Sequence, residues 1–193
     1  MRLCVYGAAS SSINQEFIDK VEEFGFQLAT KGHSLVFGGG RNGLMGATAR
    51  GVKKAGGYIL GVVPKFFDEQ TIEVIYDECD KLIQPDTMRE RKKIMEDNAD
   101  AFVVVPGGIG TFEEFFEILT LKQLCRHDKP IVIYNLQGYY NELYAMLETA
   151  TDKKFLRQDC LGLFKMCDNL DDLFNYLENY KPTNRTIKDL KEG

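Results

Sequence analysis

Residues 101–119 read AFVVVPGGIGTFEEFFEIL: a short apolar segment, a glycine-rich turn and a segment with helical periodicity. A strand that ends in glycines and turns directly into a helix presents backbone N–H groups at the positive end of the helix dipole. Glycine has no Cβ, so a ligand can approach such a turn closely. The segment therefore predicts a buried strand, and at its end a site that holds a phosphate.

The helix after the turn is predicted from apolar residues that recur at i, i+3, i+4 and i+7. They are Phe112, Phe115, Phe116 and Leu119. Thr111, followed three residues later by Glu114, matches the pattern of a capping box. By itself this pair indicates only where a helix begins. Its position directly behind P-G-G-x-G, at the end of an apolar strand, favours a role in function.

The rest of the chain alternates between strand and helix character. Continuous apolar runs predict strands at residues 3–6, 34–37, 58–63 and 130–134, with a short edge strand at 163–167. Helical periodicity predicts helices at residues 14–31, 44–55, 87–98, 139–149 and 170–179. This alternation is typical of an α/β protein, in which helices cover both faces of a parallel sheet. Ligands bind to such sheets at the carboxyl ends of the strands, where the strand order reverses.

The least regular part is residues 65–85, where we expect a loop over the site with a short strand or helix around residues 72–76. The helix at 87–98 begins with a second capping-box pattern, Thr87 and Glu90.

The length of 193 residues fits one domain over residues 1–180, followed by a polar tail over 181–193 that we expect to fray. The net charge of −5, with no basic block before the tail, argues against nucleic acid as the main partner. No apolar run is long enough to span a membrane or to act as a signal peptide, so we expect a cytoplasmic protein.

The five cysteines form no C-x-x-C pair, and we interpret them as reduced thiols. With only two histidines, His33 and His127, and no clustered ligands, the sequence predicts no structural zinc site.

Gly38, Gly40 and Gly43 match the dinucleotide pattern G-x-G-x-x-G, which is a weak signal by itself. A dinucleotide site would also need an acidic residue at the end of the next strand, but residues 61–64 read GVVP. The P-loop pattern G-x-x-x-x-G-K-[ST] is absent from the sequence. We therefore expect these glycines to serve tight turns, close packing or a single ribose phosphate.

Arg91 lies on the apolar stripe of the helix at 87–98, three residues after Met88 and three before Ile94. An unpaired buried charge is costly, so its guanidinium needs a partner. Arg91 either forms a structural ion pair or extends to solvent, or it faces a carboxylate or phosphate in a cleft. The sequence leaves these alternatives open.

Three carboxylates, Glu113, Glu114 and Glu117, follow the glycine turn. Acidic residues in a first helical turn usually only complement the helix dipole. A carboxylate beside a bound anion needs a cation nearby, and Arg91 is the natural candidate. Such a pair suits cleavage of a ribose–base bond, because positive charge develops on the sugar. A carboxylate can stabilise that charge or activate a water molecule.

Three motifs resemble those of a known family. Residues 106–114 match P-G-G-x-G-T-x-x-E, Arg91 and Lys92 match M-x-x-R-K, and residues 38–46 match G-G-G-x-x-G-L-M-G. The chain resembles the LOG ("lonely guy") family of cytokinin riboside 5′-monophosphate phosphoribohydrolases, whose members are often mislabelled as lysine decarboxylases. The resemblance covers residues 3–179.

The resemblance implies a Rossmann-like, doubly wound fold, a homodimer, and hydrolysis of AMP or an N6-modified AMP to free base and ribose 5-phosphate. It implies neither an organic cofactor nor a metal. By position, it makes Arg91 and Glu114 the catalytic pair. The substrate-binding residues that it implies are Ser10, Gly39, Gly40, Met88, Lys92, Gly107, Gly108, Ile109, Gly110, Thr111, Glu113 and Thr120.

The chain departs from the family pattern in three places that bear on substrate preference and dimer contacts. Arg89 stands where the family commonly has His, Arg41 and Asn42 stand where small residues are frequent, and residues 7–10 read GAAS instead of G-S-S. A non-catalytic nucleotide or molybdenum-cofactor carrier on the same fold is the main alternative, since a fold does not fix a function. A dinucleotide-dependent oxidoreductase is a weaker one. No lysine lies in a recognisable pyridoxal phosphate setting, so decarboxylation has no support in the sequence.

Overall fold

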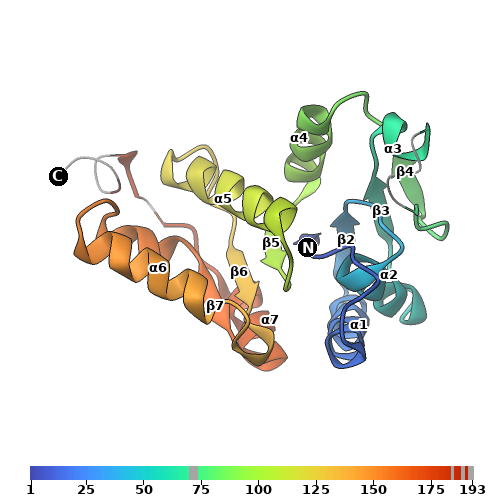
Figure 1. The fold of residues 1–193 in the computed structure, drawn as a ribbon, viewed down its shortest axis with the longest axis horizontal. Coiled ribbons are helices and arrows are strands. Elements are labelled where there is room, and N and C mark those ends of the chain that lie inside the picture. Colours follow the sequence, from blue (N-terminus) through green and yellow to red (C-terminus); the bar gives the residue numbers. More distant parts are fainter. Residues whose placement is uncertain (70–73, 184, 188–189, 191–193) are drawn as a thin grey trace.

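The computed structural model describes residues 1–69, 74–183, 185–187 and 190 (Figure 1). In this part of the chain, seven strands form one sheet in the order β4-β3-β2-β1-β5-β6-β7, and every neighbouring pair is parallel. The strands are β1 Arg2–Tyr6, β2 Ser34–Phe37, β3 Ile59–Val62, β4 Lys81–Ile83, β5 Ala101–Val104, β6 Ile131–Tyr134 and β7 Lys165–Cys167. The predicted α/β class with a parallel sheet is confirmed.

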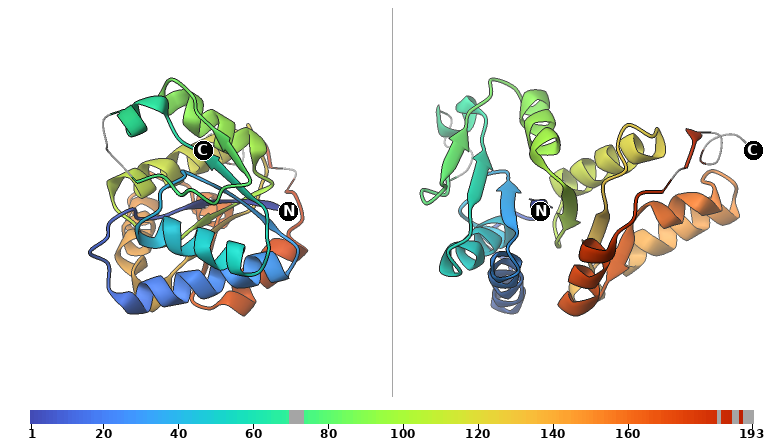
Figure 2. Two further views of the ribbon diagram at one scale, coloured as in Figure 1. Left: turned by 90° about the vertical axis from the view of Figure 1, so that its right-hand side faces the viewer. Right: turned by 180° about the vertical axis from the view of Figure 1, so that it is seen from behind.

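Helices cover both faces of the sheet (Figures 1 and 2). Buried side chains of α1, α2 and α7 pack against one face, and those of α4, α5 and α6 pack against the other. The helices are α1 Gln15–Thr30, α2 Gly43–Lys54, α3 Lys65–Glu69, α4 Met88–Asn98, α5 Ile109–Gln123, α6 Asn141–Asp152 and α7 Leu170–Asn179, with short 3₁₀ helices η1 Leu136–Gly138 and η2 Gln158–Leu163. The doubly wound arrangement is therefore also confirmed.

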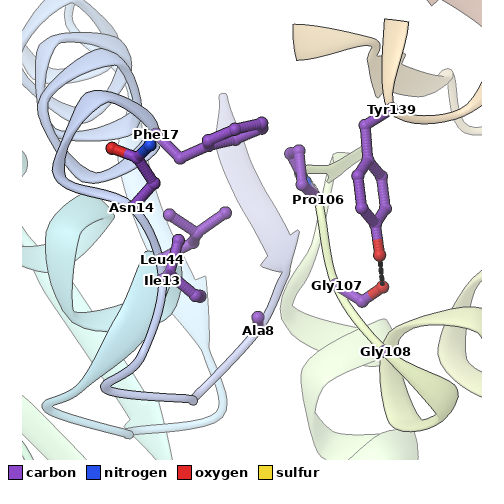
Figure 3. Close-up of a pocket in the computed structure, with 9 residues that line it drawn as sticks. All are labelled: Ala8, Ile13, Asn14, Phe17, Leu44, Pro106, Gly107, Gly108 and Tyr139. Carbon is purple, nitrogen blue, oxygen red and sulfur yellow. Dashed lines mark hydrogen bonds between the residues drawn. The ribbon is translucent and has the colours of Figure 1, made fainter. Parts of the chain in front are cut away.

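The strand order reverses between β1 and β5, which are direct neighbours in the sheet. The loops that follow these two strands consequently meet at the carboxyl edge. The amide of Ala8, after β1, donates to the carbonyl of Pro106, after β5, at 3.1 Å. Figure 3 shows these two residues near the ends of their strands. The topology thus brings the first loop and the glycine turn together, as expected for a ligand site in this class of fold.

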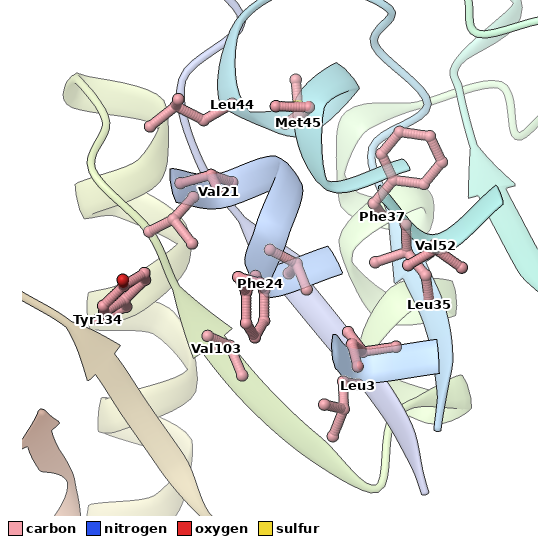
Figure 4. Close-up of a cluster of buried hydrophobic side chains, with 14 of the residues drawn as sticks. Leu3, Val21, Phe24, Leu35, Phe37, Leu44, Met45, Val52, Val103 and Tyr134 are labelled. Carbon is pink, nitrogen blue, oxygen red and sulfur yellow. The ribbon is translucent and has the colours of Figure 1, made fainter. Parts of the chain in front are cut away.

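The core on the α1 and α2 face is formed by large apolar side chains from the helices and the central strands. Phe24 of α1 and Leu3, Leu35 and Val103 of the sheet are fully buried there (Figure 4). Burying such side chains contributes roughly 1.5–3 kcal/mol each. This packing holds the central strands, and with them the carboxyl edge, in a fixed place.

The start of α5 differs from the prediction. The helix begins at Ile109 with Gly108 as its N-cap, so Thr111 and Glu114 lie inside the helix and their predicted capping box is wrong. Thr111 is buried because its side chain packs on Gly107, where a Cβ would lie only 2.1 Å from the Thr111 Oγ1. The predicted stripe also shifts: Phe115 is buried, but Phe116 is 36% exposed. In contrast, the capping box of Thr87 and Glu90 is confirmed.

Residues 65–85 contain two elements that the sequence analysis did not predict, α3 and β4. Both are short, and the outer face of β4 is exposed, so neither carries a clear periodic signal. Ile75, in the segment expected as a strand or helix at 72–76, forms an isolated bridge to Gly40, while residues 72 and 73 lie outside the described residues.

The described residues of the tail are attached to the domain, in contrast to the fraying that we expected. Thr183 donates to the Asp128 carboxylate through its amide and its hydroxyl group. Leu190 is 1% exposed and packs with Cys160 and Leu163.

Candidate active site

The amides around the start of α5 form an open row at the carboxyl edge of the sheet. The first residues of a helix have no intrahelical acceptor for their N–H groups. Among the described residues, no acceptor takes a hydrogen bond from the amides of residues 107–111. The helix dipole adds positive potential at the same place. The geometry that the glycine turn predicted for holding an anion is therefore present.

Arg91 reaches this edge from α4, and carbonyl groups of two strand ends hold it in place. Its Nε donates to the carbonyl of Val62 at 3.1 Å, and its Nη2 donates to that of Gly38 at 3.3 Å. The ring of Phe67 in α3 lies 5.7 Å from the guanidinium carbon. These contacts leave Nη1 directed at Glu114.

Glu114 faces Arg91 from the first turns of α5. The Nη1 of Arg91 lies 3.8 Å from the Glu114 Oε1, and the two side chains are 7% and 12% exposed. This separation is longer than a hydrogen bond, so both groups keep donors and acceptors for a ligand. Burial raises the pKa of Glu114 to about 7, while Arg91 counteracts the rise and Glu113 adds to it. Of the alternatives for Arg91, the structure shows the cleft guanidinium that faces a carboxylate.

The pair and the amide row line one cavity of about 380 Å³, a size within the usual range for small-molecule sites. Eight residues that the resemblance implied are in its wall: Ser10, Met88, Arg91, Gly108, Gly110, Thr111, Glu113 and Glu114. The sequence analysis missed Gly7, Ala8, Ala9, Met45 and Phe67. Gly7, Ala8 and Ala9 precede Ser10 in the loop after β1. The predicted parallel sheet places this loop at the carboxyl edge, so it could have identified them. Met45 is part of the motif at residues 38–46, and Phe67 lies in the segment expected over the site, but no pattern singles out either residue.

Lys92 lies beside the cavity, where it holds the carboxylates of α5. Its Nζ is 2.5 Å from the Glu113 Oε1 and 2.6 Å from the Glu117 Oε2. Burial pushes the pKa of Lys92 down, but the bonds to the two carboxylates outweigh it, and the net shift is upward. Lys92 therefore links α4 to α5 through two ion pairs.

Five other implied residues are not in the wall of this cavity. Gly39 packs on Val63, and Gly40 bridges to Ile75, so both serve the turn after β2. Ile109 is 87% exposed, and Thr120 is exposed further along α5. Gly107 lines a second cavity of about 250 Å³ beside the glycine turn, together with Tyr139 (Figure 3).

Gly38 is required by the position of Arg91. A Cβ at residue 38 would lie 1.9 Å from the Arg91 Nη2. We expect Gly38→Ala to displace the guanidinium and to lower kcat/KM for the hydrolysis that the resemblance implies by about 100-fold, as a shift of about 1 Å within a site can do. Unfolding in urea supplies the control. Gly38→Ala should destabilise the wild-type protein but not an Arg91→Ala variant, where the methyl group has room. Equal destabilisation in both backgrounds would contradict this role for Gly38.

Neither a metal centre nor a membrane span stands out in residues 1–69, 74–183, 185–187 and 190. No group of three or more His, Cys, Asp or Glu side chains in them is arranged to hold a metal ion. Likewise, none of their helices has the length and apolar character needed to cross a bilayer. All five cysteines are free thiols.

Comparisons with known proteins agree with the motifs. Residues 45–177 match a family model described as "Possible lysine decarboxylase". The chain is 39% identical over 170 residues to the cytokinin riboside 5′-monophosphate phosphoribohydrolase of Mycobacterium tuberculosis, covering 88% of this chain and 89% of the relative. It is 36% identical over 183 residues to the enzyme LOG5 of Arabidopsis thaliana, covering 95% and 79%. Among solved structures, the molybdenum cofactor carrier protein of Chlamydomonas reinhardtii has a TM-score of 0.69 at 23% identity, covering 92% of this chain and 95% of that one, which shows a common fold.

Proposed function

This chain belongs to the LOG family of cytokinin riboside 5′-monophosphate phosphoribohydrolases, and we propose that it hydrolyses the N-glycosidic bond of AMP or an N6-modified AMP. The products are the free base and ribose 5-phosphate. The observation that carries this function is the pairing of Arg91 with Glu114 in the cavity that the free amides of α5 line. The amide N–H groups can donate hydrogen bonds to the 5′-phosphate. Arg91 and Glu114 can then contact the ribose next to it.

The site residues divide the reaction between them. The amides of residues 108–111 bind the 5′-phosphate, and the helix dipole favours its charge. As the bond between C1′ and the base nitrogen breaks, the base leaves with the electron pair and positive charge develops on the ribose. The ionised Glu114 stabilises that charge and takes a proton from the water that attacks C1′. The departing base nitrogen takes up a proton, so the water supplies the new sugar hydroxyl and the hydrogen of the free base. Arg91 orients Glu114 and the sugar hydroxyl groups.

A panel of nucleotides tests this function. The purified protein is incubated with AMP, N6-isopentenyl-AMP, GMP, CMP and adenosine, and free base is measured by chromatography. We expect base release from the adenine monophosphates and little from adenosine, which lacks the phosphate. Tight binding of AMP without base release would instead indicate a non-catalytic carrier.

The pH dependence of the reaction should report Glu114. Because burial raises its pKa to about 7, the carboxylate is mostly ionised above pH 7 and mostly protonated below it. We expect kcat/KM to fall about tenfold per pH unit below 7. Glu113→Gln should move this limb to lower pH, since Glu113 raises the pKa of Glu114. A limb that Glu113→Gln leaves in place would mean that the substrate phosphate, and not Glu114, is titrating.

The chemistry of the lysines does not suit a decarboxylase that binds pyridoxal phosphate. Such an enzyme needs a lysine amine that loses its proton readily. Lys92 lies beside the cavity, but its ion pairs with Glu113 and Glu117 raise its pKa. Lys122 has a pKa lowered to about 8 by burial. It lies at the other end of α5, however, roughly 15–20 Å from the amide row at 1.5 Å per residue.

We also propose that the chain acts as a cytoplasmic homodimer without nucleic acid or membrane partners, and without a cofactor. Large apolar side chains exposed on and next to α5 and α6 support a protein interface: Ile109 at 87%, Phe116 at 36%, Met146 at 66% and Phe155 at 85% exposed. Exposed apolar patches of this kind often mark contacts with another chain.

A further inference from the structure

The carbonyl groups of residues 105–108 each accept a hydrogen bond from a fixed donor. The hydroxyl of Tyr140 donates to Val105 at 2.9 Å, and that of Tyr139 donates to Gly107 at 2.7 Å. The amide of Ala8 donates to Pro106 at 3.1 Å, and that of Phe112 donates to Gly108 at 3.0 Å. The turn therefore exposes its N–H groups to a ligand, while its carbonyl groups are occupied by the protein.

The peptide unit between Gly107 and Gly108 has glycine on both sides. In a trans peptide the C=O and the N–H point in opposite directions, and the chain has no cis peptide bond among the described residues. The direction of the Gly107 carbonyl thus sets the direction of the Gly108 N–H. Glycine on both sides widens the backbone conformations open to this unit. Gly107 packs on Thr111, whereas a Cβ at residue 108 would meet nothing within 4 Å. A hydrogen bond to the Gly107 carbonyl therefore favours one orientation of this unit.

The loop after β6 provides this hydrogen bond through Tyr139. Tyr139 lies after β6, on the opposite side of the second cavity from Phe17 and Ile13, and its hydroxyl reaches the Gly107 carbonyl (Figure 3). The loop before it has left-handed backbone angles at Gln137, with φ of 56°, and at Gly138, with φ of 74°. A non-glycine residue in this conformation is strained, and such strain persists only where the surroundings require it.

We propose that Tyr139 is a positioning residue for phosphate binding. Its hydroxyl fixes the Gly107 carbonyl on the side of the second cavity, and so directs the Gly108 N–H into the catalytic cavity. This role rests on the proposed function, in which a 5′-phosphate binds these amides. Tyr139 itself does not touch the reacting atoms.

The variant Tyr139→Phe tests this role, because it removes only the hydroxyl group. Tyr58→Phe is the matched control: Tyr58 is 49% exposed against 46% for Tyr139, and its hydroxyl bonds to none of the described residues. For Tyr139→Phe we expect the KM for AMP to rise about five- to tenfold, the size of one lost hydrogen bond, with kcat within about twofold of wild type. The inhibition constant of inorganic phosphate should rise by the same factor. Tyr58→Phe should change neither.

Two results would overturn the role of Tyr139. In the first, the wild type binds AMP and inorganic phosphate, and Tyr139→Phe changes neither the KM for AMP nor the inhibition constant of phosphate. The second is a loss confined to kcat, which would place Tyr139 in the chemical step. A wild type that binds neither AMP nor inorganic phosphate would remove the phosphate site, and with it both the role of Tyr139 and the proposed function.

Discussion

Replacing Glu114 by glutamine is expected to lower kcat for base release by about 10³-fold, within the range usual for loss of a general base. Glutamine keeps the shape of the side chain but cannot carry the negative charge or accept the proton of water. Base release is measured by chromatography with AMP at saturating concentration. Glu16→Gln, an exposed carboxylate on α1, is the control and should leave the rate unchanged. A Glu114→Gln variant that keeps a tenth or more of the wild-type rate would contradict the catalytic role.

The same variant should be more stable than the wild type above pH 7. The folded-state pKa of Glu114, about 7, lies above the ordinary value of 4.5 because the carboxylate is buried. Stability of the wild type therefore falls as the pH rises from 4.5 through 7, and the full penalty, about 3 kcal/mol, is present at pH 8. Glutamine does not ionise and escapes this penalty. Urea unfolding at pH 8 should show a gain for Glu114→Gln, and unfolding near pH 4 should show none.

The second large effect is expected for Arg91→Ala, which should reduce kcat/KM for base release by at least about 10³-fold. In contrast to Glu114→Gln, Arg91→Ala should also destabilise the fold. Without the guanidinium, Glu114 loses its cation, so its pKa rises further and less of it is ionised at neutral pH. The carbonyls of Gly38 and Val62 lose their buried donor. Leaving buried acceptors unpaired costs about 1–3 kcal/mol.

The measurements for Arg91→Ala are base release from AMP and urea unfolding, each against Arg126→Ala. Arg126 is exposed, three residues beyond the end of α5, and should affect neither quantity. Near-normal base release by Arg91→Ala, in a protein whose unfolding is two-state, would remove Arg91 from the mechanism.

The sequence sufficed for the parts of the fold whose signals are local and repeated. Apolar runs marked β1, β2 and β5, and α7 lies at its predicted bounds, residues 170–179. The alternation of strands and helices also predicted that the loop with Ser10 and the glycine turn share one edge of the sheet. Likewise, the position of Arg91 on an apolar stripe indicated a buried charge that needs a partner, and the structure supplies Glu114.

The parts that the sequence did not reveal depend on contacts between distant segments. Thr111 resembles a helix cap, but its packing on Gly107 places it inside α5. Residues 65–85 are expected over the site, but no pattern in the sequence indicates that Phe67 itself covers Arg91. Tyr139 is 32 residues from the carbonyl that it holds. In each case the deciding contact is tertiary, so no local pattern of residues carries it.

The most direct test of the central claim is a crystal structure of Glu114→Gln with AMP, since this variant should bind the nucleotide without cleaving it. We expect the phosphate on the amides of residues 108–111, and C1′ of the ribose facing the side chain of residue 114 with Arg91 next to it. A phosphate bound elsewhere, or a ribose whose C1′ faces away from residue 114, would contradict the proposed hydrolysis.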